Sequence, residues 1–520
     1  MLRTSLVLTT VTALLVAASP AHATGLAATG LAAPGLAAPA GDVRNPGFES
    51  GLTGWVESGS RAASFTEAGG YTGGFQLTHY AGSAYRVTTS QTVTGLRRGT
   101  YTLSLRVRSD SNASVGLDSC GSKSQRAAVP RTGPEWVRLA VTVKVTGGRC
   151  TIVLHSDAAA GKYTNFDDVT FGPSDSAPGT PLAITGADVS HVTKNEDHGA
   201  VYRSASGQRR DPFRLLAENN VDYLRLKVWV DPADGYNDRE DVLAQARRAA
   251  AAGQQLLIDF HYSDAWADPG KQNKPAAWAA LSFEDLKQAV YDHTYRVLHD
   301  LRAQGTPAAM AQVGNEINGG MLWPDGRWDN WDGLAALLTA GSTAVTAASP
   351  GTKVVLHLAE GGNNGGHRWW FDQATARNVP FDVIAVSHYV YWHGSLGALQ
   401  ANLLDLTARY GKPVLVAETA YGFTTAENDH EPNIFNATLA EAGGYPATPR
   451  GQSDALRDIL TVVAGVPNAL GVFYWEPTWT AVEGAGWDPA DPASGDGWEN
   501  QALFDYTGRA LPALSVFRKF

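Results

Sequence analysis

The chain has 520 residues, which is more than one small domain at a prior of roughly 150 residues per domain, although a single barrel can take up about 250. Hydrophobic residues make up 44% of the chain and charged residues 18%, so a sizeable core can be buried. The 41 Lys and Arg against 51 Asp and Glu give a net charge of −10, which disfavours nucleic acid and other polyanions as partners.

Residues 1–23 have the pattern of a secretory signal peptide. Arg3 supplies a positive charge, Leu6 to Ala18 is a short apolar run, and Ala21-His22-Ala23 fits the small-x-small cleavage rule. The Gly, Ala and Pro repeats of residues 24–41 predict a flexible leader. Because the apolar run is short and no later stretch reaches about 18 apolar residues, we expect a secreted, extracellular protein without membrane contact after cleavage.

Residues 42–173 show the alternation that is typical of antiparallel strands. Short β-branched or aromatic runs, such as Tyr101 to Arg108, are separated by Gly, Ser and Asn turns, with no convincing helical pattern. This predicts an all-β jelly-roll sandwich. Cys120 and Cys150 are the two cysteines of the chain, and in an exported protein we expect them to form a disulfide. Two free buried thiols are the alternative.

From residue 182 to residue 520, strand-like runs alternate with helical patterns, after a Pro-, Ser- and Gly-rich linker at residues 174–181. Eight strands with intervening helices fit a (β/α)8 TIM barrel better than a doubly wound sheet. The predicted fold class is therefore α/β, a (β/α)8 catalytic domain preceded by the sandwich. The eight candidate strands are Ile184 to Ser190, Tyr223 to Val230, Leu256 to Tyr262, Ala309 to Glu316, Lys353 to His357, Val383 to Tyr389, Val414 to Thr419 and Gly471 to Glu476.

Two carboxylates end barrel strands that lie nearly opposite each other. Glu316 ends the fourth strand and Glu418 the seventh, and barrel enzymes carry their chemistry at the carboxyl ends of strands. Two carboxyls that flank a sugar ring can hydrolyse a glycosidic bond: one protonates the leaving oxygen, and the other attacks the anomeric carbon or activates water. Asn315 can donate to a sugar 2-hydroxyl. The alternative is that both glutamates are structural, as helix caps or as partners of rim arginines.

Seven sequence blocks carry a family resemblance: Gly186 to Ser190, Asp259 to Asp264, Trp266-Ala-Asp-Pro-Gly-Lys-Gln272, Gln312-Val-Gly-Asn-Glu316, Glu418 to Tyr421, Val472 to Pro477 and Asn500 to Asp505. They closely resemble the family 53 glycoside hydrolases, which are arabinogalactan endo-β-1,4-galactanases. The resemblance covers residues 182–520. It implies a secreted, retaining, endo-acting enzyme that cleaves β-1,4-galactosidic bonds in galactan or arabinogalactan of plant pectin. It also implies that Glu316 is the general acid/base and Glu418 the nucleophile.

The resemblance implies further contacts with the nucleophile and the sugar. Arg225 and Tyr389 match positions that can hold Glu418 charged through hydrogen bonds, with ordinary structural bonding as the alternative. Substrate-binding positions are matched by His261, Asp264, Trp266, Trp392 and Trp475. The indoles offer flat faces for galactose, although core packing is the alternative for each of them.

Three departures from the family pattern concern subsite preference. Lys227 stands where a second arginine is usual, and a lysine cannot reproduce the bidentate fork of arginine. His388-Tyr389-Val390 replaces a Tyr-Tyr-Pro sequence, and Glu360 replaces an Asn-like residue. We expect these changes to affect sugar contacts rather than the reaction.

A structural calcium ion is expected between the loops after the seventh and eighth strands, as in bacterial members of the family. The expected ligands are Asp429, His430, Asn433 and Asp496, and a solvated acidic loop is the alternative. The sandwich resembles galactose-binding-like modules, in which Glu49 and Asp168 would hold another calcium ion. No cofactor is needed for the chemistry, and zinc is disfavoured because no Cys/His cluster has suitable spacing.

The sandwich is interpreted as a carbohydrate-binding module, with a merely structural role as the alternative. For the whole protein, two other functions stay open: a retaining barrel hydrolase of another β-glycan, such as mannan or xylan, and a non-catalytic galactan-binding wall protein. The Trp266 to Gln272 block disfavours the first, and the presence of both glutamates disfavours the second. We expect a monomer whose partner is the polysaccharide.

Overall fold

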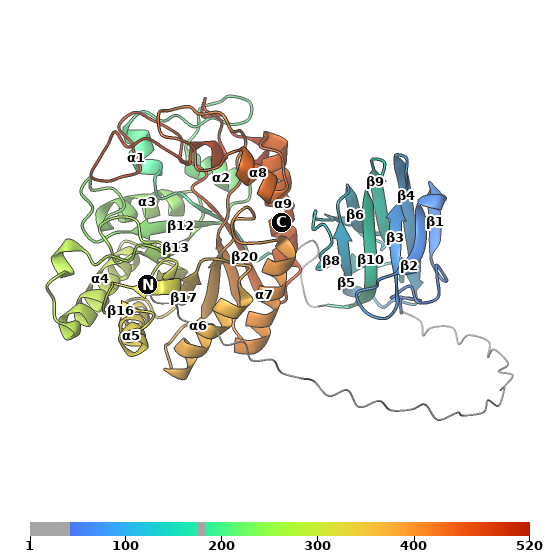
Figure 1. Ribbon diagram of the computed structural model, residues 1–520, viewed down its shortest axis with the longest axis horizontal. Coiled ribbons are helices and arrows are strands. Elements are labelled where there is room, and N and C mark those ends of the chain that lie inside the picture. Colours follow the sequence, from blue (N-terminus) through green and yellow to red (C-terminus); the bar gives the residue numbers. More distant parts are fainter. Residues whose placement is uncertain (1–41, 175–181) are drawn as a thin grey trace, which may run out of the picture. The chain divides into compact units, whose positions relative to one another are not determined.

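The computed structural model describes residues 42–174 and 182–520 (Figure 1). The expected signal peptide and leader, and all but one residue of the expected linker, lie outside these residues. Within the described part, no helix combines the length and the apolar character that a membrane crossing needs. The described residues form a region of β-strands followed by a region in which strands and helices alternate.

The first region is a sandwich of two five-stranded antiparallel sheets, as predicted. One sheet has the order β1-β4-β9-β6-β7 and the other the order β2-β3-β10-β5-β8. The strands are β1 Val56–Gly59, β2 Ser64–Ala68, β3 Phe75–Tyr80, β4 Tyr85–Thr94, β5 Gly99–Ser109, β6 Ala113–Asp118, β7 Gln125–Ala128, β8 Val137–Val145, β9 Arg149–Ala158 and β10 Tyr163–Pro173. Alternate residues, such as Leu103, Leu105 and Val107 of β5, are buried in the core.

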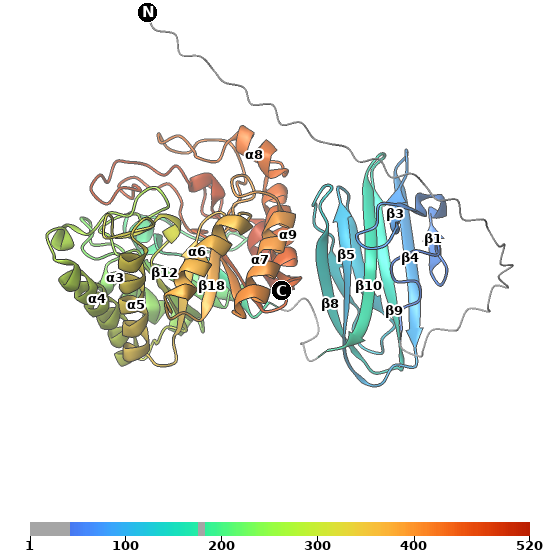
Figure 2. The ribbon, with the colours of Figure 1, turned by 60° about the horizontal axis from the view of Figure 1, so that its bottom comes forward.

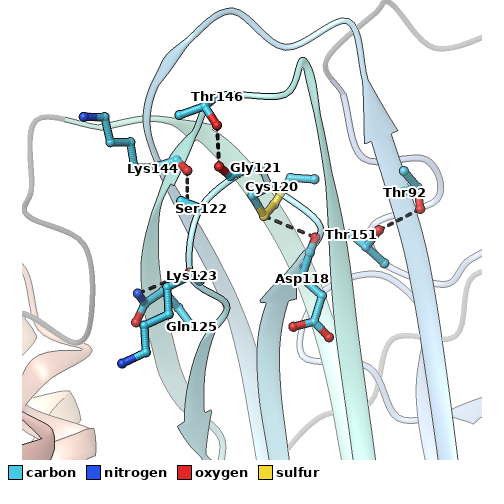
Figure 3. Close-up of a disulfide and its surroundings, with 11 residues drawn as sticks. Thr92, Asp118, Cys120, Gly121, Ser122, Lys123, Gln125, Lys144, Thr146 and Thr151 are labelled. Carbon is cyan, nitrogen blue, oxygen red and sulfur yellow. Dashed lines mark hydrogen bonds between the residues drawn. A yellow bond between two sulfur atoms is a disulfide. The ribbon is translucent and has the colours of Figure 1, made fainter.

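The predicted disulfide between Cys120 and Cys150 is confirmed (Figure 3). Cys150 lies in β9, and Cys120 follows β6, which is the neighbour of β9 in the sheet. Thr146 donates a hydrogen bond to the carbonyl of Gly121 at 2.6 Å beside the bridge. A crosslink over 30 positions stabilises the fold by about 3 to 4 kcal/mol in the chain-entropy view.

The second region is a closed barrel of eight strands, which confirms the predicted fold class. The strands are β11 Ile184–Asp188, β12 Tyr223–Val228, β13 Gln255–Phe260, β14 Met310–Val313, β17 Lys353–Leu358, β18 Val383–Ser387, β19 Val414–Glu418 and β20 Ala469–Trp475. Helices surround them in both views (Figures 1 and 2): α1 Val192–Asp197, α2 Pro212–Glu218, α3 Arg239–Ala251, α4 Phe283–Ala303, α5 Trp331–Ala348, α6 Asn364–Ala376, α7 Leu396–Tyr410, α8 Ala437–Gly443 and α9 Pro449–Ala464. A hairpin, β15 Gly320–Met321 and β16 Gly326–Arg327, follows β14.

Local capping explains where two helices begin. Asn330 caps α5 by accepting from the backbone N–H of Gly333, so this helix begins at Trp331. Thr448 caps α9, and Pro449 occupies the first helical position, where a missing N–H costs nothing.

The barrel interior changes from apolar to polar along the strands. Leu257, Met310, Val355 and Phe473 belong to one buried cluster near the strand starts. Two residues further along three of these strands stand Asp259, Gln312 and His357, which are buried and hydrogen-bonded to one another. Because side chains two positions apart share one face of a strand, this polar layer faces the interior as well. It forms the floor of the site at the carboxyl ends.

Candidate active site

Glu316 and Glu418 come together at the carboxyl ends of β14 and β19. One carboxylate oxygen of each lies within 4.8 Å of the other, and a ring nitrogen of His357 lies within that distance of both. Glu316 has a left-handed backbone with φ of 48°, which costs a non-glycine residue about 1 kcal/mol or more. Such strain is typical of active sites. The two carboxylates are close enough to act on one glycosidic bond.

Arg225 of β12 holds Glu418 from within the barrel. Its Nη1 lies 2.8 Å from Oε1 of Glu418, and the Tyr389 hydroxyl donates to Oε2 at 3.0 Å. The guanidinium also lies 2.8 Å from Asp188 and 2.8 Å from Asp259, so its position is fixed on three sides. Burial raises the pKa of Tyr389 well above its usual value, and the hydroxyl therefore keeps its proton as a donor.

The two glutamates have unequal electrostatic surroundings. Burial, and next the charge of Glu418, raise the pKa of Glu316. Burial also raises the pKa of Glu418, but the Arg225 guanidinium opposes this shift strongly. Since two carboxylates at this distance repel each other when both are ionised, Glu418 loses its proton first and Glu316 keeps its proton. One site thus holds an ionised carboxylate beside a protonated carboxyl group.

Asn315 is fixed by its neighbours before any sugar arrives. Its side-chain oxygen accepts from Arg225 at 2.8 Å and from Gln312 at 3.1 Å, and its amide nitrogen donates to the carbonyl of Ala267 at 2.8 Å. The second hydrogen of the amide is left for a ligand. Asn315 lines the cleft, where a sugar hydroxyl can accept that hydrogen.

A cleft of about 380 Å³ unites the predicted site residues around both glutamates. It is lined by Arg225, His261, Trp266, Asn315, Glu316, Tyr389, Trp392, Glu418 and Trp475 among others. Asp264 is not among these lining residues. Its two oxygens accept from the backbone N–H groups of Asp231 and Ala276, so this side chain links the loop after β12 to the loop after β13.

His261 lines the cleft with all of its ring hydrogen-bonding capacity in use. Its Nε2 lies 3.0 Å from Asp259, and its Nδ1 accepts from the backbone N–H of Ala267 at 3.1 Å. The side chain is buried. His261 therefore positions the loop that carries Trp266.

Aromatic rings form the walls of the cleft. Trp475 packs edge-on against Trp498 at 4.6 Å between ring centroids, and Trp498 lies 5.6 Å from Tyr389. The Nε1 of Trp266 donates to the carbonyl of Trp487 at 2.8 Å. Trp392 is 48% exposed at the rim. These rings offer apolar faces suited to the C–H side of pyranose rings.

Lys227, which replaces the usual arginine, also lies in the cleft wall. Its Nζ lies 4.0 Å from the ring centroid of Trp266 and 3.2 Å from Glu476. It also contacts Nδ1 of His191 at 3.0 Å. Burial lowers the pKa of Lys227, while Glu476 favours its charged form. The lysine thus supports the Trp266 ring and neutralises a buried carboxylate.

Several residues of the site were not predicted from the sequence. The cleft is also lined by Asp188, Asp268, His393 and Trp498. A ring nitrogen of His357, which lies in β17, is within 4.8 Å of a carboxylate oxygen of each glutamate. Trp498 lies in the loop after β20, two residues after the expected calcium ligand Asp496. Inward-facing polar residues within strands were the available signal for Asp188 and His357. Glu360 lines the cleft, and it accepts a hydrogen bond from Asn363 at 2.9 Å.

The two loops expected to bind calcium contact each other. The backbone N–H of Asp496 donates to Asp429 at 2.7 Å, and Asp429 and His430 line a cavity of about 460 Å³. One buried oxygen each of Asn433, Asp496 and Glu499 has no hydrogen-bond partner in the described residues. Such oxygens suit a hard cation such as calcium. The acidic side chains of these loops do not bring three ligand atoms within 4.8 Å of one another. Among the described residues, only Glu316, His357 and Glu418 do so.

In the sandwich, the expected calcium ligands Glu49 and Asp168 both bind one loop. Glu49 accepts from the backbone N–H groups of Gly74 and Phe75, the closest at 2.9 Å. Asp168 accepts from the hydroxyl of Thr72 at 2.6 Å. Both carboxylates therefore have hydrogen-bonding partners, and a metal ion at this place stays a prediction.

Fold and site together define a glycoside hydrolase of the (β/α)8 type. The sequence model of glycosyl hydrolase family 53 matches residues 184–517. The endo-beta-1,4-galactanase of Bacillus subtilis (strain 168) is 37% identical over 373 residues, covering 64% of this chain and 85% of the relative. The arabinogalactan endo-beta-1,4-galactanase of Cellvibrio japonicus (strain Ueda107) is 38% identical over 359 residues, covering 66% and 92%.

A solved structure gives the same result. The GH53 catalytic domain of Ignisphaera aggregans is 42% identical, with a TM-score of 0.63, and the match covers 67% of this chain and 98% of that domain. The chain belongs to glycosyl hydrolase family 53.

Proposed function

We propose that the protein is a retaining, endo-acting hydrolase of β-1,4-galactan and arabinogalactan, with Glu418 as nucleophile and Glu316 as general acid/base. The observation that carries this proposal is the facing pair of glutamates: one carboxylate oxygen of each lies within 4.8 Å of the other, and only Glu418 is held by Arg225, at 2.8 Å. Inverting enzymes need about 6.5 to 9.5 Å between the carboxyls to admit a water molecule. The relatives named above supply the substrate class.

The geometry supports a double displacement. Glu418 attacks the anomeric carbon while Glu316 donates its proton to the leaving oxygen, which leaves a glycosyl ester on Glu418. Glu316, now ionised, takes a proton from water as that water attacks the same carbon, and Glu418 is released. Arg225 and Tyr389 hold the oxygens of Glu418, and Asn315 faces the cleft with a free amide hydrogen for the sugar.

Reducing-sugar release from β-1,4-galactan, with mannan and xylan as competing substrates, tests the proposal. Glu316→Ala and Glu418→Ala are expected to lower the rate by several orders of magnitude. Glu360→Ala is the matched control, because this glutamate also lines the cleft but binds Asn363. A folded wild-type protein that binds galactan without cutting it would favour a wall-binding protein, and preference for mannan or xylan would favour another hydrolase.

We also propose that the sandwich binds sugar on the outward face of the β2-β3-β10-β5-β8 sheet. Tyr71 and Trp136 lie 6.1 Å apart there, covered by Arg106 at 4.3 Å and Arg108 at 4.7 Å. Arg108 also donates to Asn165 at 3.0 Å. Aromatic faces beside fixed polar groups are suited to a sugar.

Retardation of the inactive Glu418→Gln protein in a native gel that contains galactan tests the sandwich proposal. Adding Tyr71→Ala and Trp136→Ala is expected to weaken retardation severalfold. Tyr80→Ala, which removes another exposed tyrosine of the sandwich, is expected to have no effect. Unchanged retardation of the double variant would leave the sandwich a structural role.

Three further proposals concern the whole molecule. The sequence of residues 1–23 supports secretion, and we propose that the protein acts outside the cell as a monomer. Size-exclusion chromatography with light scattering tests the monomer.

We also propose a structural calcium ion held by oxygens of Asp429, Asn433, Asp496 and Glu499, with His430 beside them. The buried oxygens without partners in these loops support this ion, which takes no part in the reaction.

A further inference from the structure

Two tryptophans stand exposed on the barrel outside the catalytic cleft. Trp328 is 46% exposed and Trp369 is 45% exposed, and neither belongs to the cleft lining. Their ring centroids lie 6.4 Å apart, with an angle of 69° between the ring planes. Exposing two large indoles side by side costs apolar hydration, so such a pair points to a binding site.

The pair rests on a rigid base. Trp369 packs edge-on against the buried Trp331 at 5.9 Å, and Trp331 packs against Trp370 at 5.1 Å. Trp370 donates from its ring nitrogen to the carbonyl of Ile317 at 2.9 Å. The exposed rings are therefore supported in advance, which lowers the entropy cost of binding a ligand.

A backbone hydrogen bond also connects the pair to the segment that follows Glu316. The backbone N–H of Trp328 donates to the carbonyl of Gly319 at 3.1 Å, three residues after Glu316. Trp328 follows β16, and Trp369 lies in α6, which follows β17. Both segments begin at the carboxyl ends of barrel strands, where the cleft also lies. A ligand on the pair is thus on the end of the barrel at which the polysaccharide arrives.

Charges around the pair are balanced. Arg327 lies 3.9 Å from Asp329, and Arg377 lies 2.8 Å from Asp332. All four side chains are partly or largely exposed. Equal numbers of cationic and anionic groups favour a neutral ligand that offers hydroxyls, rather than a polyanion or a strongly charged peptide.

We propose that Trp328 and Trp369 form a second galactan-binding site, which holds a stretch of the polysaccharide on the barrel surface outside the cleft. The indoles contact the C–H faces of galactose units, and the four charged side chains bind their hydroxyls. This site rests on the proposed function for the identity of its ligand. It raises the local concentration of substrate chain at the cleft without taking part in bond cleavage.

Oxidative footprinting read by mass spectrometry tests the site on the full Glu418→Gln protein. Saturating β-1,4-galactan is expected to protect Trp328, Trp369 and the cleft residue Trp392 from oxidation, whereas mannan protects none of them. Protection of Trp392 alone would overturn the second site and leave the proposed function intact. No protection of Trp392 by galactan would instead contradict the proposed substrate.

A kinetic comparison separates a second site from an extension of the cleft. In the otherwise wild-type enzyme, Trp328→Ala with Trp369→Ala is expected to raise KM for polymeric galactan about fivefold, with kcat/KM for a short galacto-oligosaccharide unchanged. Tyr295→Ala, which removes an exposed ring of α4, is the control and should change neither value. Equal losses on polymer and oligosaccharide, or no loss on polymer, would overturn the proposal, and Phe at both positions should restore binding.

Discussion

The Nη1 of Arg225 lies 2.8 Å from the Oε1 of Glu418, deep in the barrel. The Arg225 side chain is only 1% exposed. The same guanidinium neutralises Asp188 and Asp259, so one cation stands among three carboxylates. Because this charge acts mainly on one of the two facing glutamates, it decides which of them is ionised. The proposed roles of the two glutamates rest on this asymmetry.

Arg225→Lys is expected to lower kcat by roughly 100-fold, since an ammonium cannot bind three carboxylates in the planar arrangement of a guanidinium. Weaker support for the Glu418 charge raises the pKa of Glu418. As the pH falls, Glu418 then takes up its proton, and activity is lost, at a higher pH than in the wild-type enzyme. The acidic limb of the kcat/KM profile therefore shifts to higher pH. An unchanged acidic limb in a folded variant would contradict the role of Arg225.

Glu418→Gln is expected to lower the pKa of Glu316, because removing the Glu418 charge removes a repulsion that disfavours ionised Glu316. Carbon-13 NMR of glutamate-labelled protein can follow this carboxyl group directly. Glu360→Gln removes another charge that lines the cleft and should move the pKa of Glu316 much less. A rise of this pKa in Glu418→Gln would show that the two carboxyls are not coupled in the proposed way.

Lys227→Met is expected to destabilise the fold by about 3 kcal/mol, because it leaves Glu476 buried without its cation. It also removes the cation beneath Trp266, and KM for galactan should rise more than kcat falls. Lys227→Arg keeps the positive charge and should therefore keep most of the activity and stability. Thermal unfolding and steady-state kinetics of both variants measure these effects, and equal behaviour of Met and Arg would contradict the support of Trp266.

Removal of calcium with a chelator is expected to lower the melting temperature, and added calcium should restore it. In Asp496→Asn, which weakens the expected ligand set, the chelator should have a smaller effect. The Glu49→Gln variant separates the two expected sites, because it changes the sandwich and not the barrel loops. A melting temperature that is insensitive to chelator in the wild-type protein would contradict the calcium proposal.

The sequence predicts much of this architecture because its signals are local. All eight barrel strands follow from apolar runs, and Glu316 and Glu418 follow from acidic residues at strand ends. The polar layer of Asp259, Gln312 and His357 depends on which side of each strand faces inward. That choice is fixed only when the barrel closes.

The loops show which contacts the sequence does not predict. Asp264 belongs to a block typical of the family, and its carboxylate accepts from the backbone N–H groups of Asp231, after β12, and Ala276, after β13. Trp498 reaches the cleft from a long loop after β20, and no periodicity predicts such an approach. Residue type and spacing identify chemistry at strand ends, whereas loop contacts depend on tertiary packing.

The anomeric form of the first products tests the central claim most directly. Proton NMR during the first minutes of galactan hydrolysis resolves the new reducing ends before they mutarotate. A retaining double displacement through Glu418 predicts that the β-anomer forms first. Initial formation of the α-anomer would mean direct attack by water, and the assignment of Glu418 as nucleophile would be wrong.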